Sequence, residues 1–197
     1  MSENEGRLPL LEPGALDAAQ RDLYASIAQG PRATGPFSIV DAEGRLAGPF
    51  NALLHSPSIG SAVEQLGAAL RFGGDLDART RELVICSVAA HWGSAYEWYA
   101  HERVAREIGV GDGELEIVRN GGIPDGAPAE TVALELAAAL LRERMVSPEL
   151  YQRVVAHHGP SGLVEICTVV GYYQLLAGLL AAADVDAPDD HDQEEAP

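Results

Sequence analysis

Three ionisable side chains between residues 79 and 110 have the types and spacing needed for acid–base chemistry: Glu82, Glu97 and His101. Glu97 and His101 are four residues apart, so on a helix they lie on the same face, one turn apart. A carboxylate beside an imidazole in an apolar pocket can exchange protons with a bound substrate near neutral pH. The spacing therefore predicts a proton-transfer site without a metal ligand set.

The surroundings of these groups favour that interpretation. Tyr96, Trp98 and Tyr99 flank Glu97, and aromatic surroundings are expected to raise the pKa of a carboxyl group, as a general acid requires. Glu82 stands early in the apolar stretch RELVICSVAAHW. A buried carboxylate there needs a partner, because an unpaired buried charge is costly. His101 is the candidate partner.

A purely structural interpretation competes with this one. Ser94 and Glu97 match the capping box S-x-x-E, in which the two residues satisfy backbone N–H groups at a helix start. A lone histidine such as His101 is also often structural. His91, close to a helix end before Gly93, is placed either to cap carbonyls or to line the mouth of a pocket.

Composition narrows the function classes. The chain has 197 residues, 30 acidic against 13 basic side chains and a formal charge of −17. Nucleic acid and anionic membranes are poor partners for such a chain. Cys86 and Cys167 are isolated in apolar patterns and predict core residues, not a disulfide framework. The absence of a signal peptide pattern and of a long apolar span predicts a soluble, cytoplasmic protein.

Helix signals dominate the chain, and no comparable strand alternation accompanies them. We expect an all-α fold with a first helix over 16–28 and a long Gly- and Pro-rich loop over 30–51. Asp77 is predicted to cap a helix over 78–91. The remaining helices are expected, in order, from Ser56-Pro57, over 94–108, after Asp112, over 129–144, over 147–157 and over 161–183.

Three regions follow from this pattern. We predict a flexible N-terminal arm over 1–14, a single helical domain over 15–184, and an acidic disordered tail over 185–197. The last helix, GLVEICTVVGYYQLLAGLLAAA, is apolar on nearly every face. Such a helix must be central or shared between subunits, and we expect a homo-oligomer built largely on it.

The stretch RELVICSVAAHWGSAYEWYAHERVAREIGV, preceded by GRLAGPFNALLHSP, resembles the carboxymuconolactone decarboxylase family within the alkylhydroperoxidase D-like superfamily. The resemblance covers about residues 20 to 183. It implies an all-α, alkylhydroperoxidase D-like helical bundle that assembles as a trimer or hexamer. In the redox branch a C-x-x-C pair occupies the positions of Ser94 and Glu97, so thiol peroxidase activity is disfavoured here.

The decarboxylase branch keeps Glu-x-x-x-His, matched by Glu97 and His101. By this resemblance the pair protonates the carbanion left by loss of CO₂, with no metal and no other cofactor. Glu82 would orient His101, and Arg79 or Arg81 would hold a substrate carboxylate. The resemblance thus implies a decarboxylase acting on a carboxylated lactone or similar enolisable substrate.

The aromatic run around Tyr96 and Trp98 suggests a larger or flatter ligand than that of the small decarboxylases, with Ser94 and His91 also near it. The same acid/base pair would serve an isomerase, dehydratase or cyclase in a catabolic or natural-product pathway. A non-catalytic binding protein that keeps the pocket is a third alternative.

Overall fold

The computed structural model describes residues 6–31 and 35–188. Within these ranges all regular secondary structure is helical, apart from one isolated antiparallel β-bridge between Val40 and Leu46. The helices are α1 (Ala18–Ala28), α2 (Pro49–Leu54), α3 (Pro57–Ala68), α4 (Ala78–Trp92), α5 (Ala95–Glu107), α6 (Asp112–Arg119), α7 (Pro128–Ala138) and α8 (Pro148–Ala183). A 3₁₀ turn precedes α1 (Pro13–Ala15), and π-helical turns extend α3 (Ala69–Gly73) and α7 (Ala139–Glu143). The predicted all-α class is confirmed.

Local sequence accounts for several helix boundaries. Asp17 and Gln20 form a reciprocal capping box at the start of α1. The Asp77 side chain accepts a hydrogen bond from the Thr80 N–H, so the predicted cap of α4 is confirmed. Gly93, with φ of 61°, ends α4 in the left-handed conformation that glycine adopts without strain.

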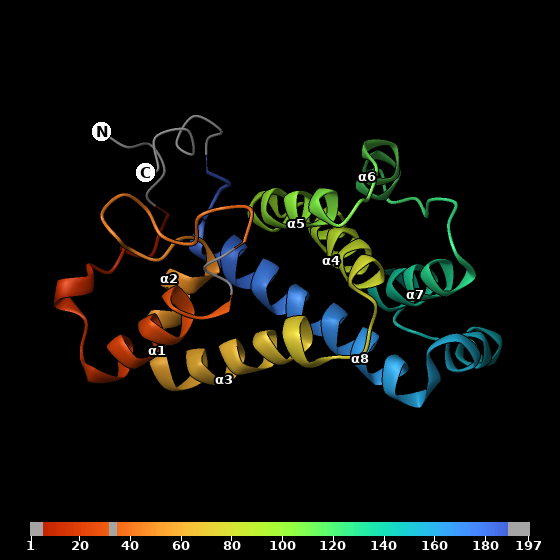
Figure 1. The fold of residues 1–197 in the computed structure, drawn as a ribbon, viewed down its shortest axis with the longest axis horizontal. Helices are drawn as coiled ribbons and strands as arrows, with labels where there is room; N and C mark the ends of the chain where they lie inside the picture. Colours follow the sequence, from red (N-terminus) through yellow and green to blue (C-terminus); the bar gives the residue numbers. More distant parts are fainter. Residues whose placement is uncertain (1–5, 32–34, 189–197) are drawn as a thin grey trace.

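Helix α8 is the central element. It runs diagonally through the middle of the molecule, between α3 below and α4 and α5 above (Figure 1), and packs against α4 and α7. The sequence predicts two helices here, over 147–157 and 161–183. The structure joins them across a kink at Gly159, whose φ of 66° is not helical, followed by Pro160.

Contrary to the expectation that the chain has no long apolar span, α8 is long and apolar enough to pass as a membrane span by length and composition alone. Half of its most apolar window is nevertheless buried inside the molecule. Its inward residues, such as Ile166, Val169 and Leu176, belong to the main hydrophobic core together with residues of α4 and α7. A core helix satisfies the same criteria, so the apolar character of α8 needs no membrane to explain it.

The N-terminal third packs as a second, smaller core of α1, α2 and the loop between them. Residues 6–14 of the predicted flexible arm are held against this part of the chain. Asn51 accepts a hydrogen bond from the Leu11 N–H and donates one to the Pro9 carbonyl, and the Arg7 N–H donates to Ala183. Residues 1–5 and 189–197, which include most of the predicted acidic tail, lie outside the described residues.

Candidate active site

Glu82 lies in the second turn of α4, a position that the Asp77 cap fixes. Its side chain faces the core, and the residue has 0 % of its surface exposed. The neighbouring positions Leu83, Val84 and Ile85 are equally buried, so the carboxylate is surrounded by apolar side chains. A group in such a place must be paired, because desolvation strongly disfavours a lone charge.

His101 of α5 is that partner, as the sequence predicts. Its Nδ1 lies 2.6 Å from Glu82 Oε2. An ionised carboxylate can only accept a hydrogen bond, so Nδ1 carries a hydrogen and donates this bond to Glu82. The other ring nitrogen, Nε2, is therefore the one available for chemistry. Burial alone would raise the pKa of Glu82, but the charge and hydrogen bond of His101, with weaker contributions from Arg71 and Arg81, lower it below its ordinary value.

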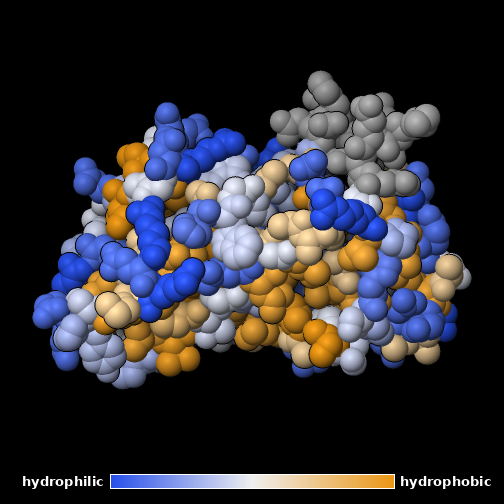
Figure 2. Space-filling view, turned by 180° about the vertical axis from the view of Figure 1, so that it is seen from behind, coloured by the Kyte–Doolittle hydropathy of each residue, from blue (hydrophilic) through white to orange (hydrophobic). Residues whose placement is uncertain are grey.

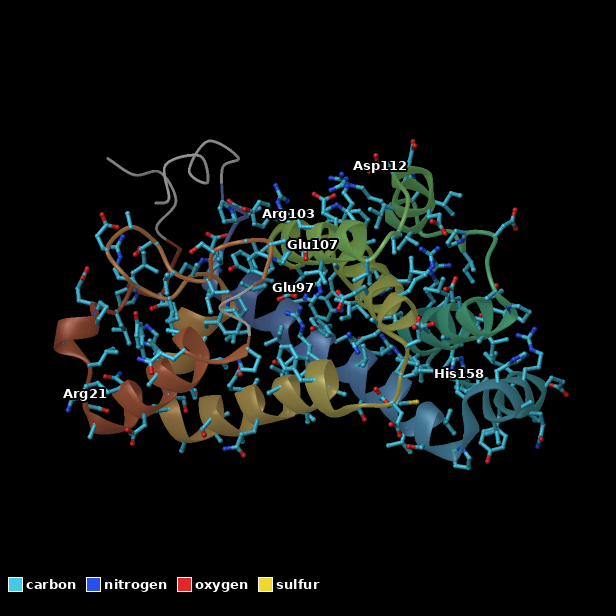
Figure 3. All side chains as sticks on the ribbon, in the orientation of Figure 1. Arg21, Glu97, Arg103, Glu107, Asp112 and His158 are labelled. Carbon is cyan, nitrogen blue, oxygen red and sulfur yellow. The ribbon has the colours of Figure 1, made fainter. Side chains whose placement is uncertain are left out.

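Glu97 occupies the other side of the imidazole. His101 Nε2 and Glu97 Oε2 are 3.6 Å apart, and Glu97 is only 3 % exposed. Figure 3 shows Glu97 on the inner side of α5, toward α8. The structure therefore brings Glu82, His101 and Glu97 together as a buried carboxylate–imidazole–carboxylate chain that links α4 to α5.

The competing capping box is not formed. Ser94 stands at the N-cap position of α5, yet its side chain makes no capping hydrogen bond. With no capping contact to Ser94, Glu97 turns its carboxylate to His101 instead. Of the two interpretations open for Glu97 at the sequence level, the geometry favours the one in which it pairs with the imidazole.

Aromatic rings close the site. The Tyr173 ring of α8 meets the His101 ring edge-on, with 4.8 Å between centroids, and Tyr172 stacks edge-on against Tyr173 at 5.2 Å. Burial raises the pKa of Tyr173 well above its ordinary value. The sequence does not single out Tyr173 within its apolar helix, and only the contact between α8 and α5 shows that its ring covers the imidazole.

Tyr96 borders the same region from the loop side. Its ring packs directly over Gly48, where an added Cβ would lie 2.1 Å from the Tyr96 Cζ. Its phenol is buried, has no hydrogen-bond partner within the described part of the chain, and has a raised pKa because of burial and the nearby Glu97. Tyr96 is therefore a predicted binding residue that directly precedes Glu97 and whose hydroxyl has no partner within the described residues.

Two arginines add positive charge around the pair. Arg81 Nε lies 3.6 Å from Glu82 Oε1, in agreement with its predicted place near the site. Arg71, on the π-helical turn after α3, also lowers the pKa of Glu82. Sequence reasoning missed Arg71, because nothing in its neighbourhood marks a π-helical turn that approaches α4 and α8.

Other predicted site residues lie elsewhere. Arg79 forms ion pairs with Glu114 and Glu130 on α6 and α7, so the structure does not bring it to His101. His91 lines a separate cavity with Arg119 and Arg142. Ser94 lines a hollow at the C-terminal end of α8.

Trp98 also points away from the imidazole. It belongs to the main hydrophobic core, and its indole N–H donates to Glu102 at 2.8 Å. Because Trp98 and Glu97 are successive residues of a helix, they face directions about 100° apart. Among the described residues no cluster of three or more His, Cys, Asp or Glu side chains has an arrangement suited to a metal ion.

Comparison with known proteins gives a family match. Residues 57–139 match the family model described as "Carboxymuconolactone decarboxylase family". This stretch contains Glu82, Glu97 and His101. No curated protein matches the sequence.

Solved structures agree on the fold. The chain is similar to the AhpD core of an uncharacterized peroxidase-related protein from Ralstonia eutropha JMP134, at 18% identity and a TM-score of 0.76, with both chains fully covered. An uncharacterized peroxidase-related protein from Silicibacter sp. TM1040 has 16% identity and a TM-score of 0.73, over 97% of this chain and 96% of that one. The apo debrominase Bmp8 has 15% identity and a TM-score of 0.70, over 95% and 94%.

These identities establish the shared fold alone, while the family match points to a catalytic role. The recognised segment coincides with the helices that build the carboxylate–imidazole–carboxylate chain. Residues 57–139 match the model of the carboxymuconolactone decarboxylase family, and the chain has a helical fold similar to that of AhpD-like proteins.

Proposed function

We propose that this protein is a cofactor-independent proton-transfer enzyme, a decarboxylase that acts on a carboxylated lactone or a similar enolisable substrate. The observation that carries the proposal is the buried chain Glu82–His101–Glu97, with 2.6 Å and 3.6 Å between successive partners. A paired imidazole flanked by a second carboxylate can hold a proton and release it to carbon. The family match of residues 57–139 supports a lyase of this kind.

Each residue has one task in this reaction. When the bond to the substrate carboxylate breaks, CO₂ leaves and its electron pair delocalises as an enolate. His101 Nε2 or Glu97 then gives a proton to the former carboxylate-bearing carbon, and water later restores that proton. Glu82 is a positioning residue: it holds the Nδ1 proton, fixes the ring and supports its positive charge. Arg81 and Arg71 supply positive charge that favours an anionic substrate.

The cysteines argue against a thiol mechanism. Cys86 is fully buried, and burial, with the nearby Glu82 and Glu102 charges, raises the pKa of its thiol. Burial also raises the pKa of Cys167. Thiolates are the reactive form, so neither residue is prepared for attack on peroxide or halide. A cysteine-to-alanine variant of Bmp8 binds 2,3,4-tribromopyrrole. From this complex we infer for the present chain only that its ligand is flat.

The test is a reaction in D₂O with carboxylated γ-lactones, followed by NMR and by CO₂ release. We expect CO₂ release with deuterium on the former carboxylate-bearing carbon. His101→Ala and Glu97→Gln should each lower turnover by about 10²-fold, the usual scale for a lost acid or base. Glu107→Gln, at the exposed last residue of the same helix, is the matched control and should retain activity.

Two results would redirect the proposal. Deuterium exchange without CO₂ release assigns the same acid/base pair to an isomerase or cyclase. Ligand binding that survives Glu97→Gln and His101→Ala, with no turnover in any variant or in the wild type, shows a binding protein instead of an enzyme.

A further inference from the structure

A second polar hollow lies beyond the carboxylate–imidazole–carboxylate chain, where the last turn of α4 meets the C-terminal ends of α6 and of the π-helical turn after α7. This cavity has a volume of about 190 Å³. Its polar lining comes from those three segments: Ser87 and His91, then Arg119 and Asn120, then Arg142. His91 is nine residues after Glu82, about 13 Å further along the helix axis, so the hollow is a separate site.

The charge of this hollow is unusual for the chain. The sequence carries 30 acidic residues and a formal charge of −17, yet no carboxylate lines the cavity. Other arginines, such as Arg79 and Arg106, lie beside carboxylates. Within the described residues, no ion pair engages Arg119 or Arg142. Two uncompensated guanidinium groups and an imidazole therefore converge on one hollow.

Helix ends alone do not account for these side chains. Basic residues are common in the last turn of a helix, where they compensate for free carbonyls. Here backbone amides take several of those carbonyls: the Gly93 and Ser94 N–H groups donate to Ala90 and Ala89, and the Gly121 and Gly122 N–H groups donate to Val118 and Ile117. Within the described residues, the side chains of His91 and Arg119 donate to no helix-end carbonyl, so neither acts as a cap.

The guanidinium groups are also held in place. Arg142 Nη2 donates to the Gly121 carbonyl at 2.6 Å, which ties it to the rim formed by the turn after α6. The Arg119 guanidinium carbon lies 5.1 Å from the centroid of the Trp98 ring, within cation–π range. Arginines held on two sides of a cavity lose less side-chain entropy when they bind a ligand.

We infer that this hollow is a binding site for a small oxyanion. Guanidinium groups pair with the oxygens of phosphate and carboxylate through parallel, charge-assisted hydrogen bonds. The Ser87 hydroxyl and the Asn120 amide add neutral hydrogen-bonding groups to the same lining. The site takes its ligand whether or not Glu97 and His101 catalyse a reaction.

Titration calorimetry of the full-length chain with inorganic phosphate tests the inference, at an ionic strength kept constant with NaCl. A second arm uses succinate, which distinguishes a phosphate site from a carboxylate site. We expect saturable binding of one of the two. Arg119→Gln and Arg142→Gln should each weaken it by about 10-fold, the effect of one lost charge-assisted pair.

Arg21→Gln is the matched control, because it removes the same charge from the opposite end of the molecule (Figure 3). It should change the affinity by less than about 2-fold, since a screened distant charge contributes little. Circular dichroism confirms that each variant is folded. Absence of saturable binding of both anions overturns the inference. Equal losses in Arg21→Gln and Arg119→Gln overturn it as well, because they would show a nonspecific charge effect.

Discussion

Glu82 illustrates how a buried charge is made tolerable. With 0 % exposure it would be costly alone, but the imidazole at 2.6 Å and the Arg81 guanidinium at 3.6 Å lie beside different oxygens of its carboxylate. The net result is a pKa below the ordinary value, so the carboxylate stays ionised at neutral pH. The same ionisation gives Glu82 a measurable role in stability.

We expect stability to fall with acidification through Glu82. Because its pKa is lower in the folded than in the unfolded chain, its contribution is fully present above about pH 4.5 and is lost as pH falls through the lower, folded value. Glu82→Gln should reduce this part of the pH dependence. At neutral pH the variant should lose about 1–3 kcal/mol, because the amide accepts the Nδ1 hydrogen bond without a charge.

Denaturant unfolding at pH 7 and at pH 3.5 measures both effects. Glu107→Gln, on the exposed end of α5, serves as the control and should keep the wild-type difference between the two pH values. An unchanged difference in Glu82→Gln would show that other carboxylates dominate acid unfolding.

At the scale of elements, the sequence predicts most helices because their signals are local. The Asp77 cap and the 3.6-residue periodicity from Ala78 onward suffice to predict α4, and Gly109 marks the end of α5. The sequence does not predict the short helix α2, because its first three residues belong to the Gly- and Pro-rich segment 30–51, and the three that follow are too few to show a helical pattern. Its burial comes from tertiary packing.

The candidate site divides in the same way. The Glu97–His101 spacing is visible in the sequence because both residues share one helix. The Glu82–His101 contact is predicted indirectly, because a buried carboxylate needs a charged or hydrogen-bonding partner. Arg71 and Tyr173 could not be assigned, because they come from turns and helices whose approach to α5 depends on the whole fold. Arg79, predicted at the site, binds Glu114 and Glu130 instead, since α6 and α7 offer nearer carboxylates.

Gly48 connects the loop before α2 to the site through Tyr96. Its φ of 59° is strained for other residues, and an added Cβ would meet three Tyr96 ring carbons at 2.1–2.6 Å. Gly48→Ala should therefore displace the Tyr96 ring or the loop and destabilise the fold by about 2–4 kcal/mol. Thermal unfolding, with tyrosine signals read by near-UV circular dichroism, measures the change.

Gly113→Ala is the matched control, because nothing lies within 4 Å of a Cβ added there and its φ is not left-handed. Gly113 is the second residue of α6, where alanine has a higher helix propensity than glycine. The control should be neutral or slightly stabilising. A Gly48→Ala variant as stable as this control would mean that the loop moves freely away from Tyr96.

On the scale of the whole molecule, apolar residues remain on the outside of its central helix. Although α8 buries most of its apolar residues, Val164, Gly171 and Leu175 stay exposed at heptad-like spacing along one side. An apolar hollow of about 470 Å³ adjoins this stripe around Val164 and Tyr151. Figure 2 shows apolar side chains gathered on the lower half of one face of the molecule. Such a surface is typical of a contact between protein subunits.

We therefore expect a homo-oligomer, a trimer or a hexamer, in which α8 contributes to the interface. Light scattering after size exclusion measures the mass. Val164→Glu should shift the chain toward monomer, because a charge would be buried in an apolar contact. Ile117→Glu, which adds the same charge on the exposed side of α6, should not.

Assembly should also depend on salt. With a formal charge of −17 per chain, subunits repel one another, and this repulsion is screened by salt. Assembly should thus strengthen between about 20 and 300 mM NaCl. A monomer at every salt concentration would show that the outer stripe of α8 is simply tolerated in water.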